Sequence, residues 1–199
     1  MIEYLLIVIN VLFGIFTLVS VKDAIKKKES IVYYLNLARM LAHETTCRCP
    51  HSKDEGRGRG FASVAVLHFG TSQEQVIGTG VNISSNGSVC RECKRSGASR
   101  GQQYGACPAI HGETNSILEC FSNTDLRSLE DVTIFSSSRG STEGMLQGVP
   151  SAHPCINCAE VINITGVKDF YGFDDNGKVE KWNRKDCYGG LTYSPSVWN

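Results

Sequence analysis

The sequence predicts an α/β sandwich built around a mixed β-sheet and preceded by a single transmembrane helix. Three observations lead to this prediction. Short apolar, strand-like segments alternate with segments of helical periodicity along most of the chain. One long uncharged run occupies the N-terminus. The 199 residues suffice for one membrane span and one compact domain, and hardly more.

The N-terminal run extends from Tyr4 to Val21 without a charged residue. At about 1.5 Å per helical residue, its length is near the minimum for crossing a hydrocarbon core of roughly 30 Å. Two other interpretations compete with a membrane anchor. A cleaved signal peptide would begin with a basic region, which Met1 to Glu3 lack, and a buried helix of the domain would usually show a polar stripe.

Charges on the two sides of the run predict the orientation. Glu3 precedes it, whereas four lysines follow it at positions 22, 26, 27 and 28. Under the positive-inside rule the following residues lie in the cytoplasm. The chain is therefore expected to be a single-pass membrane protein whose main domain faces the cytoplasm. The predicted divisions are a transmembrane anchor over 1–21, a basic juxtamembrane linker over 22–30 and the domain over 31–199.

The elements of this domain follow from hydrophobic periodicity. Residues 31–44 place Leu35, Ala38 and Ala42 at helical spacing. The almost continuously apolar segment 62–69 suits a strand buried on both faces, and the turn at Gly70 pairs it with the next strand as a hairpin. The expected elements are a helix over 31–44, strands over 62–69 and 75–83, a helix over 109–120, a strand over 131–136, a helix over 155–164, and strands over 167–173 and 178–182.

Two short motifs carry the chemistry. His111 and Glu113 form H-x-E, and Pro154, Cys155 and Cys158 form P-C-x-x-C. Together they match the signature of the zinc deaminases. A purely structural Cys/His zinc site is the alternative. Two helix starts and the correctly offset glutamate argue against that alternative.

Zinc chemistry independently supports this interpretation. A catalytic zinc keeps three protein ligands and one open position for water. His111, Cys155 and Cys158 supply three ligands, and the two thiolates lie one helical turn apart, so both can face one ion. Glu113 is then free to act as the proton shuttle beside the water.

Longer segments resemble a known family. VIGTGVN at 76–82, ACPAIHGETNSIL at 106–118 and PCINCAEVINITGVKDFYGF at 154–173 are similar to the deoxycytidylate (dCMP) deaminase branch of the cytidine deaminase superfamily. The resemblance implies a cytidine-deaminase-like fold, a three-layer α/β/α sandwich. It also implies a catalytic zinc on His111, Cys155 and Cys158, with Glu113 as proton shuttle. Homo-oligomers are common in the family, so a homo-oligomer is expected.

Further site residues are expected on the same basis. The resemblance brings Asn82 towards the nucleotide, and Asn115 is expected to have a supporting or substrate-binding role. Gly112 stands where the family usually has alanine. A second, structural zinc is expected among Cys90, Cys93, Cys47 and Cys107, because Cys90 and Cys93 have ligand spacing. Free thiols are the alternative.

The predicted function is zinc-dependent hydrolytic deamination of a cytosine nucleotide, with dCMP giving dUMP and ammonia. Twenty basic residues balance twenty acidic ones, so the overall charge of a general nucleic-acid binder is absent. A small-molecule nucleotide is therefore the expected partner, and nucleic acid is not. Two alternatives stay open: a deaminase of cytosine or adenine in RNA or single-stranded DNA, and a non-catalytic membrane-anchored nucleotide sensor on the same fold.

Overall fold

The structure is a computed structural model that describes residues 23–45, 60–84, 109–139, 154–173 and 178–183. Residues 23–41 form a helix, which a 3-10 turn continues over Ala42–Glu44. The later elements are β1 (Phe61–Leu67), β2 (Gln75–Val81), β3 (Ile83–Ser84), β4 (Ala109–Ile110), α2 (Gly112–Asn123), β5 (Val132–Ser138), α3 (Ile156–Thr165), β6 (Asp169–Phe173) and β7 (Val179–Asn183). The chain divides into two compact units, Met1–Tyr33 and Tyr34–Asn199, and all the strands belong to the second unit.

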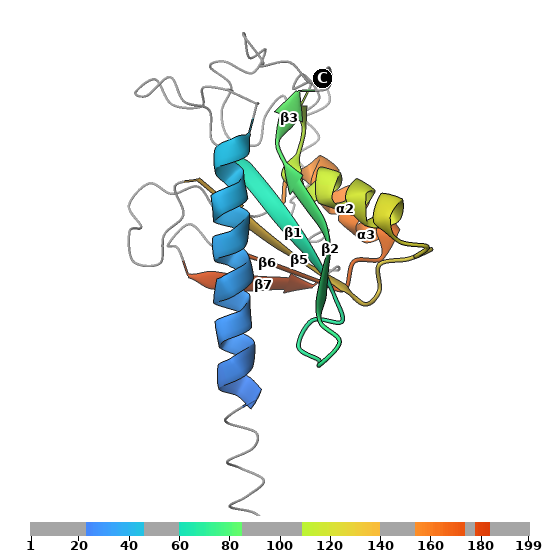
Figure 1. The fold of residues 1–199 in the computed structure, drawn as a ribbon. Coiled ribbons are helices and arrows are strands. Elements are labelled where there is room, and N and C mark those ends of the chain that lie inside the picture. The colour runs from blue at the N-terminus through green and yellow to red at the C-terminus, as the bar shows by residue number, and fades with distance from the viewer. Residues whose placement is uncertain (1–22, 46–59, 85–108, 140–153, 174–177, 184–199) are drawn as a thin grey trace, which may run out of the picture. The chain divides into compact units, whose positions relative to one another are not determined.

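The main sheet is mixed and has the strand order β2-β1-β5-β6-β7 (Figure 1). The pairs β2/β1 and β6/β7 are antiparallel, as expected for strands joined by short connections. The pair β1/β5 is also antiparallel, although β2, β3, β4 and α2 lie between these strands in the chain. The pair β5/β6 is parallel, and α3 is the helix in the crossover between these two strands. A separate two-stranded ladder joins β3 to β4. The predicted mixed α/β fold is therefore confirmed.

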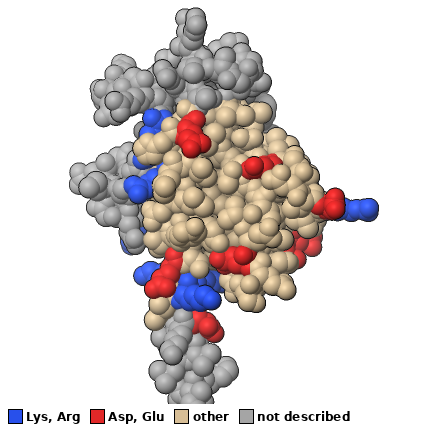
Figure 2. All heavy atoms as spheres, viewed as in Figure 1, with Lys and Arg blue, Asp and Glu red and all other residues tan. Residues whose placement is uncertain are grey.

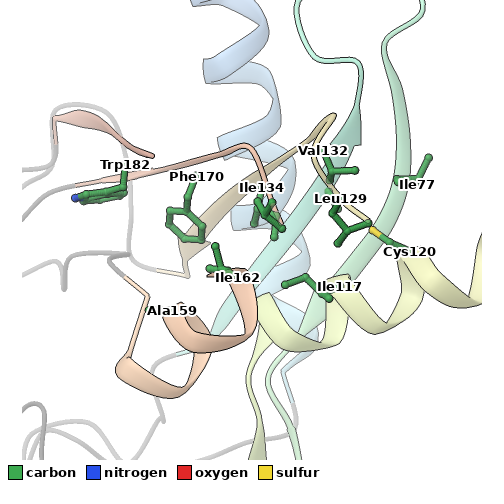
Figure 3. Packing of buried hydrophobic residues seen from close by; sticks show 12 residues of the cluster. Ile77, Ile117, Cys120, Leu129, Val132, Ile134, Ala159, Ile162, Phe170 and Trp182 are labelled. Atoms are coloured by element: carbon green, nitrogen blue, oxygen red, sulfur yellow. The ribbon is translucent and has the colours of Figure 1, made fainter. Parts of the chain in front are cut away.

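The helices α2 and α3 cover one face of the sheet. Ile117 of α2 and Ile162 of α3 are both 1% exposed, and they pack in one hydrophobic cluster with Val132 and Ile134 of β5 (Figure 3). Phe170 of β6 extends this cluster towards β7. Burial of such side chains, worth roughly 1.5–3 kcal/mol each, holds both helices against the sheet.

The opposite face of the sheet packs against residues that begin at Tyr34. Its ring contacts Phe135 of β5 at a centroid distance of 5.0 Å, and Phe69 follows at 6.2 Å. Phe135 also stacks on Tyr171 of β6 at 5.2 Å. Since successive strand residues point to opposite faces, Ile134 and Phe135 belong to different layers. The second unit therefore has helical residues on both faces of its sheet.

Glycines allow α2 to lie unusually close to β2. A Cβ placed on Gly80 would collide with backbone atoms of Gly112 and Ser116, and one placed on Gly78 would collide with Ser116. A methyl group at Gly112 would come within 2.9 Å of the Gly80 carbonyl oxygen. The alternation of glycine along β2 is therefore a packing requirement, because only glycine lets two backbones approach so closely.

Among the residues that the structure describes, no helix is both long enough and apolar enough to cross a membrane. This finding contradicts the predicted transmembrane helix, and the predicted membrane anchor and cytoplasm-facing orientation are corrected with it. The uncharged run to which the span was assigned lies within 1–22, outside the described residues. The described helix over 23–41 carries Lys26, Lys27, Lys28 and Arg39. Each such charge costs roughly 2.5–3.5 kcal/mol at the centre of a membrane helix.

One predicted helix begins in the wrong place. The sequence predicts a helix from residue 109, whereas Ala109 and Ile110 form β4 and pair with Ser84 and Ile83. The helix α2 starts only after His111, whose backbone is extended. The apolar residues at 109 and 110 fit either structure, so periodicity does not separate them.

Candidate zinc site

His111 and Glu113 owe their placement to the start of α2. His111 is the N-cap residue of the helix, with φ −76° and ψ 154°, so its side chain projects from the helix end. Glu113 lies in the first turn and is 6% exposed. The backbone N–H of Gly112 donates to the side-chain Oδ1 of Asn82 at 2.7 Å. This bond satisfies one of the N–H groups that a helix start leaves without an internal partner.

The two cysteines are placed by α3 in a similar way. Cys155 is the N-cap residue of α3, with φ −68° and ψ 166°, and Cys158 lies one turn further along. Pro154 precedes them and lies outside the helix. Cys158 is 1% exposed and also contacts the Thr114 hydroxyl of α2 at 3.7 Å. The starts of α2 and α3 therefore meet, and the four predicted side chains come from these two starts.

The ligand atoms lie close enough to share one metal ion. The Nδ1 atom of His111 is 3.2 Å from the Sγ atom of Cys155 and 3.4 Å from the Sγ atom of Cys158. These three atoms all lie within 4.8 Å of one another. Zn–N and Zn–S bonds of about 2.1 and 2.3 Å in a tetrahedral arrangement separate nitrogen from sulfur by about 3.5 Å. His111, Cys155 and Cys158 therefore form a candidate zinc site of the expected composition and spacing.

The electrostatics of the cluster suit metal binding. The hydrogen bond with Cys158 lowers the pKa of the Cys155 thiol to about 4, with a further contribution from His111. The same hydrogen bond, together with burial, raises the pKa of Cys158, so Cys155 is the thiol of this pair that loses its proton first. The thiolate is the form that binds metal. Burial raises the pKa of the Glu113 carboxyl above its usual value. The Oε2 atom of Glu113 accepts a hydrogen bond from the Cys158 thiol at 3.7 Å, so the carboxyl lies directly beside the ligand set.

The two asparagines have different surroundings. Asn82 is 9% exposed and bonds to Gly112 as described, and its carbonyl oxygen accepts a bond of 2.6 Å from the Thr45 hydroxyl. Asn115 lies on α2, and its Nδ2 atom donates to the Val81 carbonyl at 3.4 Å. The structure thus places both asparagines between α2 and the end of β2.

Sequence reasoning missed Thr114 and Thr45. Thr114 stands between Glu113 and Asn115 in the motif segment and contacts a ligand sulfur. Thr45 follows the first helical segment and holds the backbone at Asn82. Neither position carries a signal in the sequence, because each contact joins residues far apart in the chain.

The second zinc is untested by the described residues. Cys47, Cys90, Cys93 and Cys107 all lie outside the described ranges, so the structural zinc stays a prediction. Within the described part of the chain, a cavity of about 320 Å³ lies elsewhere, along β2 and the second half of α2. Its lining includes neither the metal ligands nor Glu113.

Comparison with known families identifies the class of protein. The family model of the cytidine and deoxycytidylate deaminase zinc-binding region matches residues 39–173. Because the match covers more than half of the 199 residues, the chain belongs to this family. The match includes all three ligands and Glu113. The family relationship and the ligand cluster together define a zinc-binding deaminase domain, and zinc is its cofactor.

Solved structures give more distant likenesses. The cytidine deaminase from Burkholderia pseudomallei is 14% identical, with 78% of this chain and 93% of that chain covered and a TM-score of 0.48. The dCMP deaminase from the cyanophage S-TIM5 is 15% identical in its apo form, covering 70% and 79% with a TM-score of 0.42. Its complex with dCMP and dUMP covers 70% and 77% with a TM-score of 0.43. No curated protein matches the chain.

Proposed function

We propose that this protein catalyses the zinc-dependent hydrolytic deamination of a cytosine nucleotide, and that dCMP, giving dUMP and ammonia, is its substrate. One observation carries the proposal. A buried carboxyl group, Glu113, lies beside a ligand sulfur in a cluster of one imidazole and two thiols. A structural zinc site has four protein ligands and needs no carboxyl group beside it, whereas a hydrolytic site needs an open position and a proton carrier.

Each residue has a separate task in this proposal. When bound, zinc lowers the pKa of water towards neutrality and so supplies hydroxide for attack on C4 of cytosine. His111, Cys155 and Cys158 would hold the ion and leave its fourth position for water. Glu113 would accept one proton of this water and pass it to the ring nitrogen. It would then take the proton of the new C4 hydroxyl and give it to the amino group, which leaves as ammonia while C4 becomes a carbonyl. One C–O bond replaces one C–N bond, and water and ammonia balance the reaction.

The burial of Glu113 favours this role. A carboxyl group that exchanges protons with a substrate works best when its pKa is near the working pH, and burial raises the pKa of Glu113 in that direction. We further propose that Asn82 approaches the nucleotide, because its side chain lies against the residue that follows His111. Asn115 then supports the same end of β2.

The choice of substrate rests on the sequence segments and on charge. The segments at 76–82, 106–118 and 154–173 resemble dCMP deaminases over both the zinc motifs and the flanking strands. Basic and acidic side chains both occur on the face that Figure 2 shows, and the whole chain has a formal net charge of zero. This distribution supports a small nucleotide better than a long polynucleotide, whose binding needs many phosphate contacts.

A panel of substrates tests the proposal. Zinc-loaded full-length protein is incubated with dCMP, dCTP, deoxycytidine, cytidine, CMP and a cytosine-bearing oligonucleotide, and ammonia release is measured. We expect turnover of dCMP, with kcat/KM at least about tenfold above that of deoxycytidine, because a buried phosphate contact is worth more than 1.4 kcal/mol. Turnover of the oligonucleotide alone would transfer the protein to the nucleic-acid deaminases. If the folded, zinc-loaded protein releases ammonia from none of these compounds, a non-catalytic nucleotide sensor would instead be favoured.

A further inference from the structure

One side of α2 carries a row of polar side chains that bond to the free edge of β2. In the described sheet β2 is an edge strand, paired with β1. Asn115 donates to the Val81 carbonyl at 3.4 Å, and Asn123 donates to the Ile77 carbonyl at 3.4 Å. Between them, Glu119 accepts hydrogen bonds from both the backbone N–H and the hydroxyl of Thr79, the latter at 2.9 Å.

The hydrogen bonds are regularly spaced along both α2 and β2. The helix residues 115, 119 and 123 are four apart, and the strand residues 81, 79 and 77 are two apart. Four helical residues rise about 6 Å and two strand residues about 6.8 Å, so the row runs antiparallel to the strand in step with it. The row therefore occupies backbone groups that a sixth strand would otherwise bond.

A second row on α2 fixes the same alignment from the sheet face. Gly112, Ser116 and Cys120 lie against the two glycines of β2, with no room for a Cβ on Gly78 or Gly80. The glycine contacts set how close the helix lies. These contacts are made by backbone atoms and by the Cys120 sulfur, whereas the hydrogen bonds of the first row are directional and join particular atoms of α2 and β2.

Glu119 is held by hydrogen bonds more than by packing. A cavity of about 320 Å³ lies beside it, lined by residues 75–79 of β2 and by Glu119, Asn123 and Thr124. The Oε2 atom of Glu119 accepts both hydrogen bonds from Thr79. Glu119 is the one carboxylate among the three polar side chains of the row. Bonds that involve a charged group are about twice as strong as neutral ones, so Glu119 contributes most to the alignment.

We propose that Glu119 is a positioning residue for the zinc site: by clamping Thr79 it sets the register of α2 on β2 and so holds His111 and Glu113 opposite the two cysteines of α3. A shift of α2 by one residue would move its start by about 1.5 Å and turn it by about 100°. Metal ligands tolerate only about 0.2 Å. The inference rests on the proposed function only where it concerns turnover, since it concerns metal geometry first.

The test compares Glu119→Ala with a variant that loses stability for another reason. Val167→Ala removes a fully buried side chain from the same hydrophobic cluster, in the segment between α3 and β6. Full-length proteins are loaded with Co²⁺ in place of zinc, and the absorption bands that report the cysteine and histidine ligands are recorded. Zinc-loaded samples then give kcat and KM for the substrate that the panel identifies. Melting temperatures show how much stability each of the two variants has lost.

We expect Glu119→Ala to shift the Co²⁺ bands and to lower kcat on the order of tenfold to a hundredfold, as a misplaced catalytic group does. Val167→Ala at equal or lower melting temperature should leave the bands unchanged. Glu119→Gln, whose amide oxygen still accepts from Thr79, should restore the wild-type spectrum. Should Glu119→Ala not fold, Glu119→Asp, one methylene shorter, takes its place in the same comparison.

Wild-type Co²⁺ bands in Glu119→Ala, with kcat no lower than in Val167→Ala, would overturn the inference and leave Glu119 as a cover for the strand edge. Failure of the proposed function would look different. In that case no protein in the set would release ammonia, while the Co²⁺ spectra would still distinguish Glu119→Ala from its control. Ser122→Ala, an exposed change on the same helix, should match the wild type in every measurement.

Discussion

Cys120 of α2 and Cys158 of α3 are both buried thiols, yet their surroundings differ. Cys158 lies 3.4 Å from His111, whereas Cys120 packs in the hydrophobic cluster two turns along the helix from the site. Burial raises the pKa of Cys120 to about 12, so this thiol stays protonated. The same residue type therefore lies in the candidate zinc site at one position and is a small apolar side chain at the other.

A pair of serine substitutions tests this distinction. We expect Cys158→Ser to lower zinc affinity by more than the roughly 10–100-fold that loss of an outer-shell partner costs, because a ligand itself is lost. Cys120→Ser should retain full zinc content and lose about 1–3 kcal/mol of stability, since it buries a hydroxyl in an apolar cluster. Metal analysis and urea denaturation measure the two effects. Equal zinc loss in both variants would argue against the assigned ligand set.

At the residue scale the sequence predicted which residues come together in the candidate zinc site, but not the contacts that hold them there. The H-x-E and P-C-x-x-C spacings place His111, Cys155 and Cys158 at helix starts, and the structure brings these three together. The bond from Gly112 to Asn82 joins residues 30 apart in the chain, so no local pattern shows it. The proton-shuttle role of Glu113 stays a prediction until turnover is measured.

At the scale of elements, the close approach of α2 to β2 decides which residues the strand can carry. Gly80 faces the first turn of α2, and a Cβ there would collide with backbone atoms, which cannot rotate away. Gly112 stands where the family usually has alanine. The structure shows a tighter fit, since a methyl at 112 would lie 3.0 Å from the Cα atom of Ala62.

Gly80→Ala measures this fit. We expect a loss of about 1–3 kcal/mol or more in the free energy of unfolding, because overpacking must push α2 from the sheet. Gly70→Ala is the comparison: its Cβ would meet nothing within 4 Å, and only its φ of +83° opposes the change, at about 1–2 kcal/mol. Zinc affinity should also fall in Gly80→Ala and not in Gly70→Ala. Similar losses of zinc affinity in both variants would contradict the account.

Most strands were predictable because their apolar runs are short and bounded by turns. The hairpin of β1 and β2, the buried β5 and the crossover through α3 all match the expected elements within a few residues. The boundary at His111 was missed because β4 depends on pairing with β3, a long-range contact. The predicted transmembrane helix was wrong: among the described residues no helix is long and apolar enough to cross a membrane, and the helix over 23–41 carries four basic residues.

At the scale of the whole molecule, the buried core belongs to the compact unit that starts at Tyr34. Tyr34 and Leu35 are 7% and 1% exposed, whereas Lys26 to Glu29 are exposed. We therefore propose that residues 31–199 fold without the residues before them, as the predicted domain boundary requires. This fragment should keep its zinc and melt within a few degrees of the full chain, because a loss of 1 kcal/mol shifts Tm by about 2–4 °C at this size.

Starting the fragment at residue 37 instead should remove the Tyr34 and Leu35 contacts and destabilise the protein by several kcal/mol. Calorimetry on both fragments distinguishes these cases. Should the 31–199 fragment melt far below the full chain, the domain would have to begin earlier than we propose.

The most direct test of the account is the exchange of Glu113 for glutamine. Glu113→Gln keeps the shape of the buried side chain and leaves the three ligands intact, so zinc content should equal that of the wild type. Because the amide cannot carry the proton, dCMP turnover should fall by roughly 10²–10⁴-fold. Ammonia release and metal analysis on the same samples give both values. Zinc-loaded Glu113→Gln that deaminates dCMP at the wild-type rate would contradict the proposed role of the site.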